Sequence, residues 1–184
     1  FSSKNSLIDD IIKAKPRIII LNKSDLADDA ETKKWTEYYK NKGFYPLITD
    51  CKSQKGLNKF YELVEILLKE KLDRRKNRNL EKLSIRILIV GIPNSGKSTF
   101  INSLSNSKKA KAEDRPGVTR TKQVIHLENG YDLIDMPGIL VPKIENQKSG
   151  INLAITGAIK DEIMDLIYLS EELLIFLKSN YPQS

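Results

Sequence analysis

Apolar runs and amphipathic segments alternate along the chain, and their order predicts its main elements. Residues 17–21 carry an unbroken β-branched run, which is typical of a strand covered on both faces, and the apolar-rich residues 85–90 predict a second buried strand. The segment 57–72 places apolar residues at helical spacing and predicts a helix of about four turns. Residues 28–42 predict a polar helix, and residues 45–49 predict a short strand.

The later part of the chain continues this alternation. Two predicted strands, 122–127 and 131–135, flank Asn129-Gly130, a pair that favours a tight hairpin. Further helices are predicted over 6–14, over 97–104 and from Leu153 onward. Strands that alternate with crossover helices predict a three-layer α/β fold with a mainly parallel sheet.

Length and composition favour one globular domain with a short appendage. The chain has 184 residues, of which 40% are hydrophobic, enough for a core. A single cysteine, Cys51, excludes a disulfide framework and favours a reducing compartment. No apolar run approaches the roughly 20 residues that cross a bilayer. We therefore expect a soluble protein with no membrane partner.

Positive charge is the strongest compositional signal. Thirty-one lysines and arginines stand against 24 acidic residues, which gives a net charge of +7. The basic stretch 73–84 is predicted to be a linker, and a second basic group consists of Lys108, Lys109, Lys111, Arg115, Arg120 and Lys122. Two interpretations stay open for each group: a solvated surface, or contact with the phosphates of a polyanion.

The histidine and the aromatic side chains of the 28–42 helix are interpreted as structural. His126 lies among apolar residues of a predicted strand, which favours a structural role. Trp35, Tyr38 and Tyr39 share one helix, which favours packing over stacking on nucleic-acid bases.

A phosphate-binding loop follows the strand 85–90. Residues Gly91–Ser98 read Gly-Ile-Pro-Asn-Ser-Gly-Lys-Ser and match G-x-x-x-x-G-K-[ST] between a strand and a helix. The glycines allow successive N–H groups to face phosphate oxygens, and the helix N-terminus favours negative charge. Lys97 is expected to reach the β- and γ-phosphates, and the Ser98 hydroxyl is expected to bind Mg²⁺.

The tetrapeptide Asn22-Lys23-Ser24-Asp25 follows the strand 17–21 and favours guanine. The Asp25 carboxylate can accept from both N1–H and the exocyclic amine of guanine, a pair of donors that adenine lacks. Asn22 is expected to bond the base and the neighbouring loop, and the Lys23 stem to cover the base. Taken alone, the tetrapeptide is also compatible with a helix N-cap at Ser24 or Asp25. An ATP-using P-loop protein is disfavoured by Asn22 and Asp25.

A second turn, Asp50-Cys51-Lys52, follows the predicted strand 45–49. Guanine-binding proteins carry a Ser-Ala-Lys-like turn in this place, whose backbone N–H meets guanine O6. The match is partial, because Cys51 replaces alanine and Asp50 replaces serine. A catalytic thiol at Cys51 is disfavoured, because no histidine is near in sequence.

Two further motifs fit the loops that respond to the γ-phosphate. Asp135-Met-Pro-Gly138 matches D-x-P-G, so the Asp135 carboxylate is expected to hold Mg²⁺ through a water and the Gly138 N–H to bond the γ-phosphate. Thr119 is expected to close over Mg²⁺ and the γ-phosphate, within a loop at about 107–121 that triphosphate orders. A plain surface loop is the alternative for Thr119.

The order of these motifs is that of a circular permutation. In an ordinary small GTPase the phosphate loop comes first, whereas here 22–25 and 50–52 precede 91–98, Thr119 and 135–138. A compact domain allows this rearrangement because its ends lie close together.

This order resembles the circularly permuted GTPases of the ribosome biogenesis GTPase A type. The resemblance extends over nearly the whole chain and rests also on the segments 114–119, 135–143 and 156–161. It implies a cytoplasmic GTPase that binds the maturing large ribosomal subunit and assists its late assembly, with no DNA partner. It also implies Mg²⁺ as cofactor and stimulation by potassium, for which Asn94 matches the asparagine ligand of potassium-dependent relatives.

Two departures from the expected patterns matter for hydrolysis. Ile139 stands where Ras-like enzymes carry the glutamine that orients water, and isoleucine has no group to orient it. In the resembled family a histidine from an amino-terminal segment does this, and we expect that segment and the first strand to be missing before residue 1. We expect a permuted GTPase domain over 1–150 and, over 151–184, a helical segment that leads to a truncated C-terminal domain.

The predicted site combines these motifs. The residues expected to bind GTP or GDP are Asn22, Lys23, Ser24, Asp25, Asp50, Cys51, Asn94, Ser95, Gly96, Lys97, Ser98, Thr99 and Gly138. Those expected to act in hydrolysis are Lys97, Thr119 and Gly138. The ligands expected for Mg²⁺ are Ser98, Thr119 and Asp135, and for potassium Asn94.

Two alternatives for the function stay open. One is a GTP-dependent RNA- or ribosome-binding module with negligible hydrolysis, which Ile139 favours. The other is a permuted GTPase that acts on another ribosomal particle. GTPases of the small subunit usually carry an oligonucleotide-binding barrel and a zinc site, and neither is found in the sequence.

Overall fold

The chain forms two compact units. The computed structural model describes residues 2, 12, 15–77, 84–106, 123–127, 130–137, 146–159 and 165–182. One unit contains residues 14–89 and 96–137, and we call it the strand unit; the other contains 1–13, 90–95 and 138–184, and we call it the helical unit. The chain passes from one to the other within the phosphate loop. The domain boundary expected at residue 150 stays a prediction, and it falls inside a helix.

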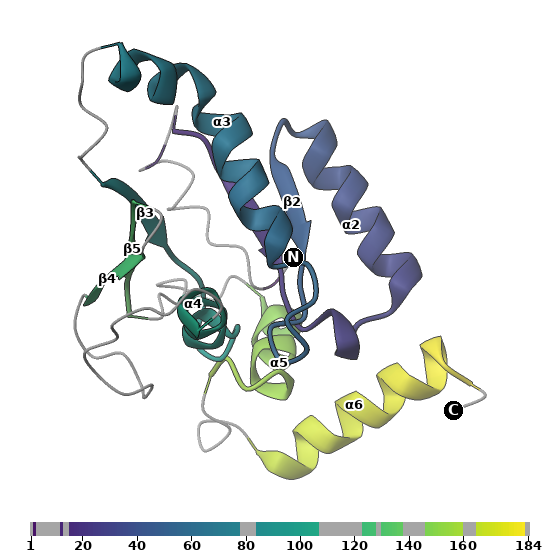
Figure 1. Ribbon diagram of the computed structural model, residues 1–184. Helices are drawn as coiled ribbons and strands as arrows, with labels where there is room; N and C mark the ends of the chain where they lie inside the picture. The colour runs from purple at the N-terminus through teal and green to yellow at the C-terminus, as the bar shows by residue number, and fades with distance from the viewer. Residues whose placement is uncertain are drawn as a thin grey trace. The chain divides into compact units, whose positions relative to one another are not determined.

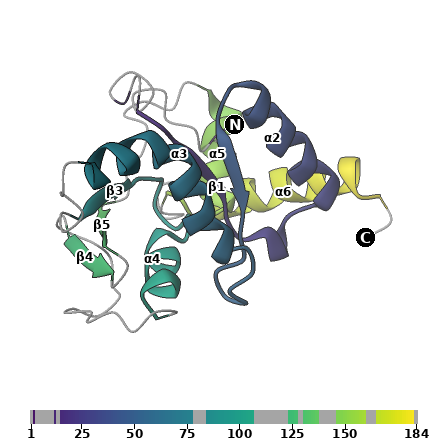
Figure 2. The same cartoon turned by 45° about the horizontal axis from the view of Figure 1, so that its top comes forward.

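The first sheet of the strand unit pairs β1 (Ile18–Leu21) with β2 (Tyr45–Ile48) in parallel. The helices α2 (Asp29–Asn41) and α3 (Asn58–Lys76) lie on opposite sides of this pair (Figure 1; Figure 2). The bounds of β1, β2 and α2 agree with the hydrophobic pattern. Because β1 and β2 are parallel, the loops that follow them leave the same edge of the sheet.

The second sheet contains β3 (Ile85–Ile89), β4 (Gln123–Leu127) and β5 (Tyr131–Asp135), with β5 in the middle. β5 runs parallel to β3 and antiparallel to β4, so the predicted hairpin is confirmed. The helix α4 (Lys97–Asn106) follows β3 and packs against β5. Among the described residues the strands form two sheets, each with a parallel pair, where the sequence predicted one.

One hydrophobic core joins the two sheets of the strand unit. α3 supplies Phe60, whose ring meets Phe100 of α4 edge-on at 5.3 Å, and Tyr61, whose ring lies 6.0 Å from Tyr131 of β5. The largest fully buried side chains of this unit are those of Phe100, Ile101, Leu104, Leu133 and Thr49. α3 therefore packs against both sheets.

The linker predicted from residue 73 onward is wrong at its start, because α3 continues to Lys76. The apolar periodicity ends with Leu72, which is why the pattern placed the helix end there. Lysine and arginine are good helix formers, and positive charge is favourable near a helix C-terminus. Arg74 also forms an exposed ion pair with Glu70, one helical turn earlier, at 3.1 Å, which stabilises the last turns of α3 slightly.

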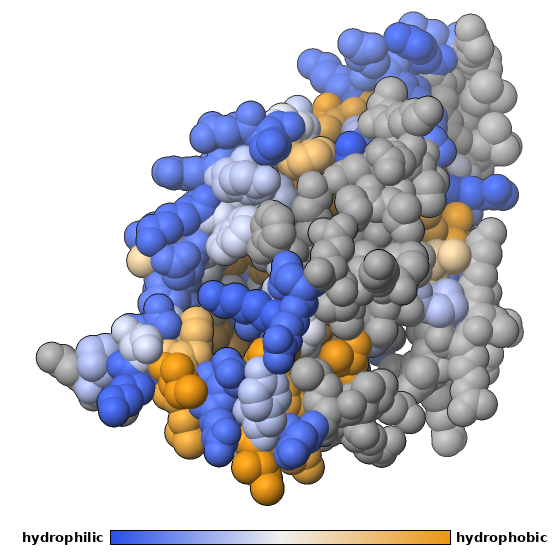
Figure 3. All heavy atoms as spheres, turned by 180° about the vertical axis from the view of Figure 1, so that it is seen from behind, coloured by the Kyte–Doolittle hydropathy of each residue, from blue (hydrophilic) through white to orange (hydrophobic). Residues whose placement is uncertain are grey.

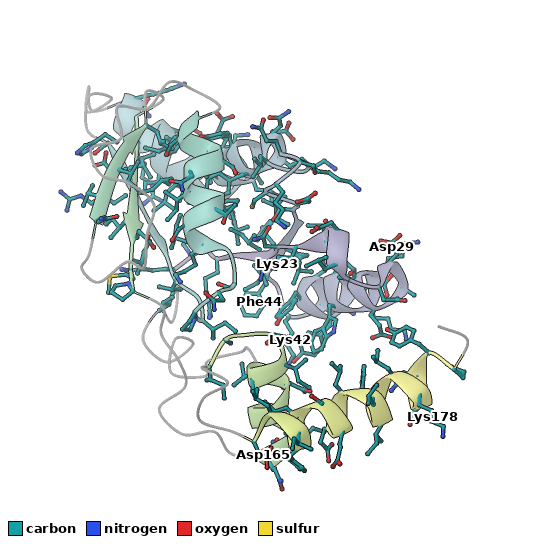
Figure 4. The ribbon with its side chains drawn as sticks, turned by 90° about the horizontal axis from the view of Figure 1, so that it is seen from below. Lys23, Asp29, Lys42, Phe44, Asp165 and Lys178 are labelled. Atoms are coloured by element: carbon teal, nitrogen blue, oxygen red, sulfur yellow. The ribbon has the colours of Figure 1, made fainter. Side chains whose placement is uncertain are left out.

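Aromatic side chains form a cluster on α2 and beyond its end. The Trp35 and Tyr38 rings lie 5.4 Å apart and nearly perpendicular, and Tyr38 packs in the same way on Tyr39. After the helix, Phe44 lies near Lys42 (Figure 4) and the Arg17 guanidinium stacks over its ring at 4.7 Å. The rings contact each other, in agreement with the predicted packing role.

The helical unit contains α5 (Gln147–Ile155) and α6 (Leu166–Asn180). Asn146 and Asp165 cap them by accepting from backbone N–H groups. α5 begins earlier than the predicted position 153, because the cap at Asn146 lies outside the apolar pattern. Hydrophobic side chains gather along α6 in Figure 3, and those exposed are Leu166, Ile167, Leu174, Ile175, Phe176 and Leu177. None of the helices in the described parts of the chain is long and apolar enough to cross a membrane.

A row of polar side chains crosses the outer face of the second sheet. Arg86, Asp132 and His126 face one another on β3, β5 and β4. His126 Nδ1 lies 2.7 Å from an Asp132 oxygen, and the Ser84 hydroxyl donates to the other oxygen. His126 therefore has a structural partner, although its side chain is 77% exposed rather than in the core. Burial acts to raise the pKa of the Asp132 carboxyl, but the hydrogen bonds from Ser84 and His126 outweigh it and hold the pKa below its ordinary value.

We predict that Asp132→Asn lowers the free energy of unfolding at pH 7 by about 1 kcal/mol, because it removes the charged acceptor of two hydrogen bonds. A lowered folded-state pKa stabilises the protein above the ordinary aspartate pKa of about 4, and this contribution is lost as pH falls through the folded-state value. Urea denaturation between pH 7 and pH 3 should therefore show the two proteins converging at low pH. The exposed Asp73→Asn serves as control, and a difference that is constant with pH would contradict the assignment.

Candidate functional site

The Asn22–Asp25 segment leaves β1 and turns at once. Lys23 adopts a left-handed conformation with φ 59° at the end of β1 (Figure 4), and the 3-10 helix η1 (Ser24–Leu26) follows. The Ser24 N–H donates to the Thr49 carbonyl at 3.1 Å, which ties this segment to the end of β2. The helix-cap alternative is wrong, because Asp28 caps α2.

Asn22 brings three segments together. Its Oδ1 accepts from the Thr49 hydroxyl at 3.2 Å and from the Cys51 thiol at 3.0 Å. On its other side, its Nδ2 occupies the space where a side chain of Gly96 would lie. Asn22 is therefore the point at which the guanine motif, the turn after β2 and the end of the phosphate loop meet.

The turn after β2 is organised by Asp50. Its backbone pairs with Lys55 in both directions, at 3.1 and 3.0 Å, and its carboxylate accepts from the Lys52 N–H and the Ser53 hydroxyl. The Ser53 hydrogen bond is the main cause that lowers the pKa of the Asp50 carboxyl, against the opposing effect of burial. Asp50 thus shapes the turn, a role that sequence comparison with the Ser-Ala-Lys turn missed. An aspartate followed closely by a serine is a turn signal that could have indicated it.

The N-terminus of α4 carries the part of the predicted phosphate-binding loop that belongs to the strand unit. The Phe100 N–H donates to the Gly96 carbonyl at 2.8 Å, so the helix begins immediately after Gly96. Lys97, Ser98 and Thr99 occupy its first turn, where N–H groups without helical partners favour an anion. Deeper in the helix, the Ser103 hydroxyl donates to the Cys51 carbonyl at 3.0 Å. This bond ties α4 to the turn after β2, and no sequence motif signals it.

The preceding loop residues belong to the helical unit. Asn94 is left-handed, with φ 55°, and its Nδ2 donates to the Gly157 carbonyl after α5 at 2.5 Å. The Ser95 hydroxyl donates to the Ile92 carbonyl at 2.8 Å. Ile92 is buried with Leu153 and Ala158 of this unit. The contact between Asn94 and Gly157 joins residues far apart in sequence, so the sequence motifs could not indicate it.

The predicted magnesium ligands are described only in part. Asp135 ends β5 and is 3% exposed, and Ser98 is half-buried in the first turn of α4. Thr119, Gly138 and Ile139 lie outside the described residues. Within those described, no three acidic, histidine or cysteine side chains form a metal cluster. One carboxylate and one hydroxyl are oxygen donors that fit Mg²⁺, which commonly takes its other ligands from water and from the phosphates of a substrate.

We predict that Gly96→Ala destabilises the protein more than Gly43→Ala. Both glycines have positive φ, +88° and +76°, but a Cβ on Gly43 meets nothing within 4 Å, whereas one on Gly96 overlaps Asn22. The shared backbone penalty is about 1–2 kcal/mol, and the overlap should add about 1–3 kcal/mol at Gly96 alone. Urea denaturation measures both, and equal losses would show that Asn22 does not occupy this space.

Comparisons with known proteins agree with the motifs. A family model described as 50S ribosome-binding GTPase matches residues 86–177. The chain is 48% identical to ribosome biogenesis GTPase A of Priestia megaterium, over 99% of this chain and 64% of that protein. It is 33% identical to mitochondrial ribosome-associated GTPase 1 of Mus musculus, over 96% of this chain and 56% of that protein.

Comparison with solved structures agrees with the sequence comparisons. The GDP-bound structure of TM YlqF matches with a TM-score of 0.65 and 31% identity, over all of this chain and 68% of that one. GNP-bound YlqF from T. maritima matches with a TM-score of 0.60 and 30% identity, over 91% of this chain and 60% of that one. The chain spans less than two thirds of the length of the first curated relatives. By motifs, sequence and fold, the chain belongs to the 50S ribosome-binding GTPase family.

Proposed function

We propose that the chain binds guanine nucleotide and hydrolyses GTP as a conformational switch. The observation that carries this proposal is the placement of Asn22, which holds the guanine motif against the turn after β2 and against Gly96. Guanine selectivity and phosphate binding need these segments side by side. The family match supports the same conclusion.

Each part of the site has a proposed task. Asp25 is exposed in η1 and accepts from the guanine base, with Lys23 over the base and Ser24 fixed to the strand end. The Lys52 N–H already serves the Asp50 carboxylate, so the Cys51 N–H is the proposed donor to guanine O6. The phosphates bind from Asn94 to Thr99, with Lys97 supplying the charge.

Mg²⁺, held by Ser98, Thr119 and Asp135, would supply positive charge at the β- and γ-phosphates. Lys97, Thr119 and the Gly138 N–H are the groups of this chain proposed to act on the γ-phosphate. Potassium would bind at Asn94. The Asn94 Nδ2 donates to the Gly157 carbonyl, so the Asn94 amide oxygen is the proposed ligand atom for the ion.

The proposed partner is the large ribosomal subunit, and the proposed compartment is the cytoplasm. The relatives named ribosome biogenesis GTPase A and the family description support a ribosomal partner. The net charge of +7 suits binding to RNA phosphates. A second candidate, a GTP-dependent binding module with negligible hydrolysis, is favoured by Ile139, whose hydrocarbon side chain cannot orient water.

We predict that Asp25→Asn exchanges guanine for xanthine selectivity. The amide presents a donor where guanine also has one, whereas xanthine offers an oxygen there. Competition of GDP and XDP against a fluorescent nucleotide should show GDP affinity falling at least about 100-fold, by analogy with the loss of one partner of a charged pair, and XDP affinity rising. Asp29→Asn, in the first turn of α2, is the matched control. Unchanged GDP preference in Asp25→Asn would place the base elsewhere.

Hydrolysis should be slow in sodium and several-fold faster in potassium, and faster again with large ribosomal subunits. Asn94→Ala should bring the ratio of the potassium rate to the sodium rate close to one, because the site then has no side-chain oxygen to ligate the ion. Single-turnover assays on this chain and on a longer chain matching its relatives test this. Negligible hydrolysis under all these conditions would favour the binding-module alternative. Fast turnover in sodium without a partner would reveal a catalytic group not assigned above.

A further inference from the structure

The side-chain amide of Asn22 could be oriented in either of two ways. An amide has an oxygen on one side and an NH₂ group on the other, so rotation by half a turn exchanges acceptor and donor. In this protein the Thr49 hydroxyl and the Cys51 thiol both donate to Oδ1, so two hydrogen bonds hold the amide in one orientation. The Nδ2 donor is thereby directed at Gly96.

The Cys51 side chain is held firmly enough to act on Asn22. Cys51 is 5% exposed. Its backbone carbonyl accepts a hydrogen bond from the Ser103 hydroxyl of α4, and its thiol donates to Asn22, so both the backbone and the side chain of Cys51 are held in place. Burial raises the pKa of the Cys51 thiol, so the group stays protonated and able to donate at neutral pH. An alanine here would supply the same backbone but no donor.

We infer that Cys51 is a positioning residue of the nucleotide site, whose thiol, together with the Thr49 hydroxyl, orients the Asn22 amide toward the phosphate loop. This inference rests on the proposed guanine-nucleotide binding and adds to it a side chain that binds no nucleotide atom itself. The effect of Cys51 passes through Asn22, so it depends on the presence of the Asn22 amide.

The test compares GDP affinity in Cys51→Ala, Cys51→Ser and a matched control, Ser105→Ala, which removes another buried hydroxyl of the strand unit. Cys51→Ala should weaken GDP binding about three- to fivefold, as expected for one hydrogen bond from a weak donor. Cys51→Ser retains a donor and should restore most of the affinity, and Ser105→Ala should bind as the wild type does. Melting temperatures without nucleotide verify that each variant is folded.

A double-mutant cycle separates positioning from a general structural effect. In an Asn22→Ala background, Cys51→Ala should change GDP affinity less than about 1.5-fold, because the thiol then has nothing to orient. If Asn22→Ala abolishes measurable binding, the cycle is run in Thr49→Val. In the Thr49→Val background the Cys51 thiol is the remaining one of the two donors to Asn22. Cys51→Ala should therefore reduce GDP affinity by a larger factor there than in the wild type.

The outcomes distinguish this inference from the proposed function. A wild-type protein that binds no GDP would overturn the proposed function itself. A wild type that binds GDP, with Cys51→Ala binding equally well, would overturn the positioning role alone. Equal effects of Cys51→Ala in the wild type and in the chosen background would also overturn it, because the thiol would then act independently of Asn22.

Discussion

The absence of a side chain at Gly96 is the constraint on which the proposed site depends. Because Gly96 has no Cβ, the Asn22 amide can lie directly against the phosphate loop, and the loop can adopt its positive φ. The oxygen of the same amide accepts from the turn after β2. A single side chain thus links three loops that belong to three different strands. Any larger residue at Gly96 would separate the guanine motif from the phosphate-binding helix.

The parallel strand pairs explain why the loops leave each sheet at one edge. β1 and β2 are parallel, so the segments 22–26 and 49–56 leave the same edge. β3 and β5 are parallel as well, so the phosphate loop and Asp135 follow strands that run together. Parallel α/β sheets place ligand-binding loops at the carboxyl ends of their strands for this reason. The circular permutation changes only the order in which the chain visits these ends.

The sequence predicted the strands well, because runs rich in buried β-branched residues leave strong local patterns. It placed the end of α3 too early, because charged residues continue a helix without any apolar periodicity. The bond from Ser103 to Cys51 was missed because it depends on tertiary placement. The shaping of the turn by Asp50 was missed although its hydrogen bonds are local and an aspartate followed closely by a serine is a turn signal. The contact between Asn94, the expected potassium ligand, and Gly157 was not predicted, because the two residues are 63 positions apart and no local sequence pattern indicates such a contact. Thr119, Gly138 and Ile139 stay predictions, because they lie outside the described residues.

The side-chain amide of Asn22 offers the most direct measurement of the central claim. In a nuclear magnetic resonance spectrum of protein labelled with ¹⁵N-asparagine, its NH₂ protons should exchange with water more slowly than those of Asn41, which is exposed at the end of α2. Addition of GDP with Mg²⁺ should shift these resonances, and addition of ADP should leave them in place. Exchange as fast as that of Asn41, with no response to GDP, would contradict the account that Asn22 joins the guanine motif to the phosphate loop.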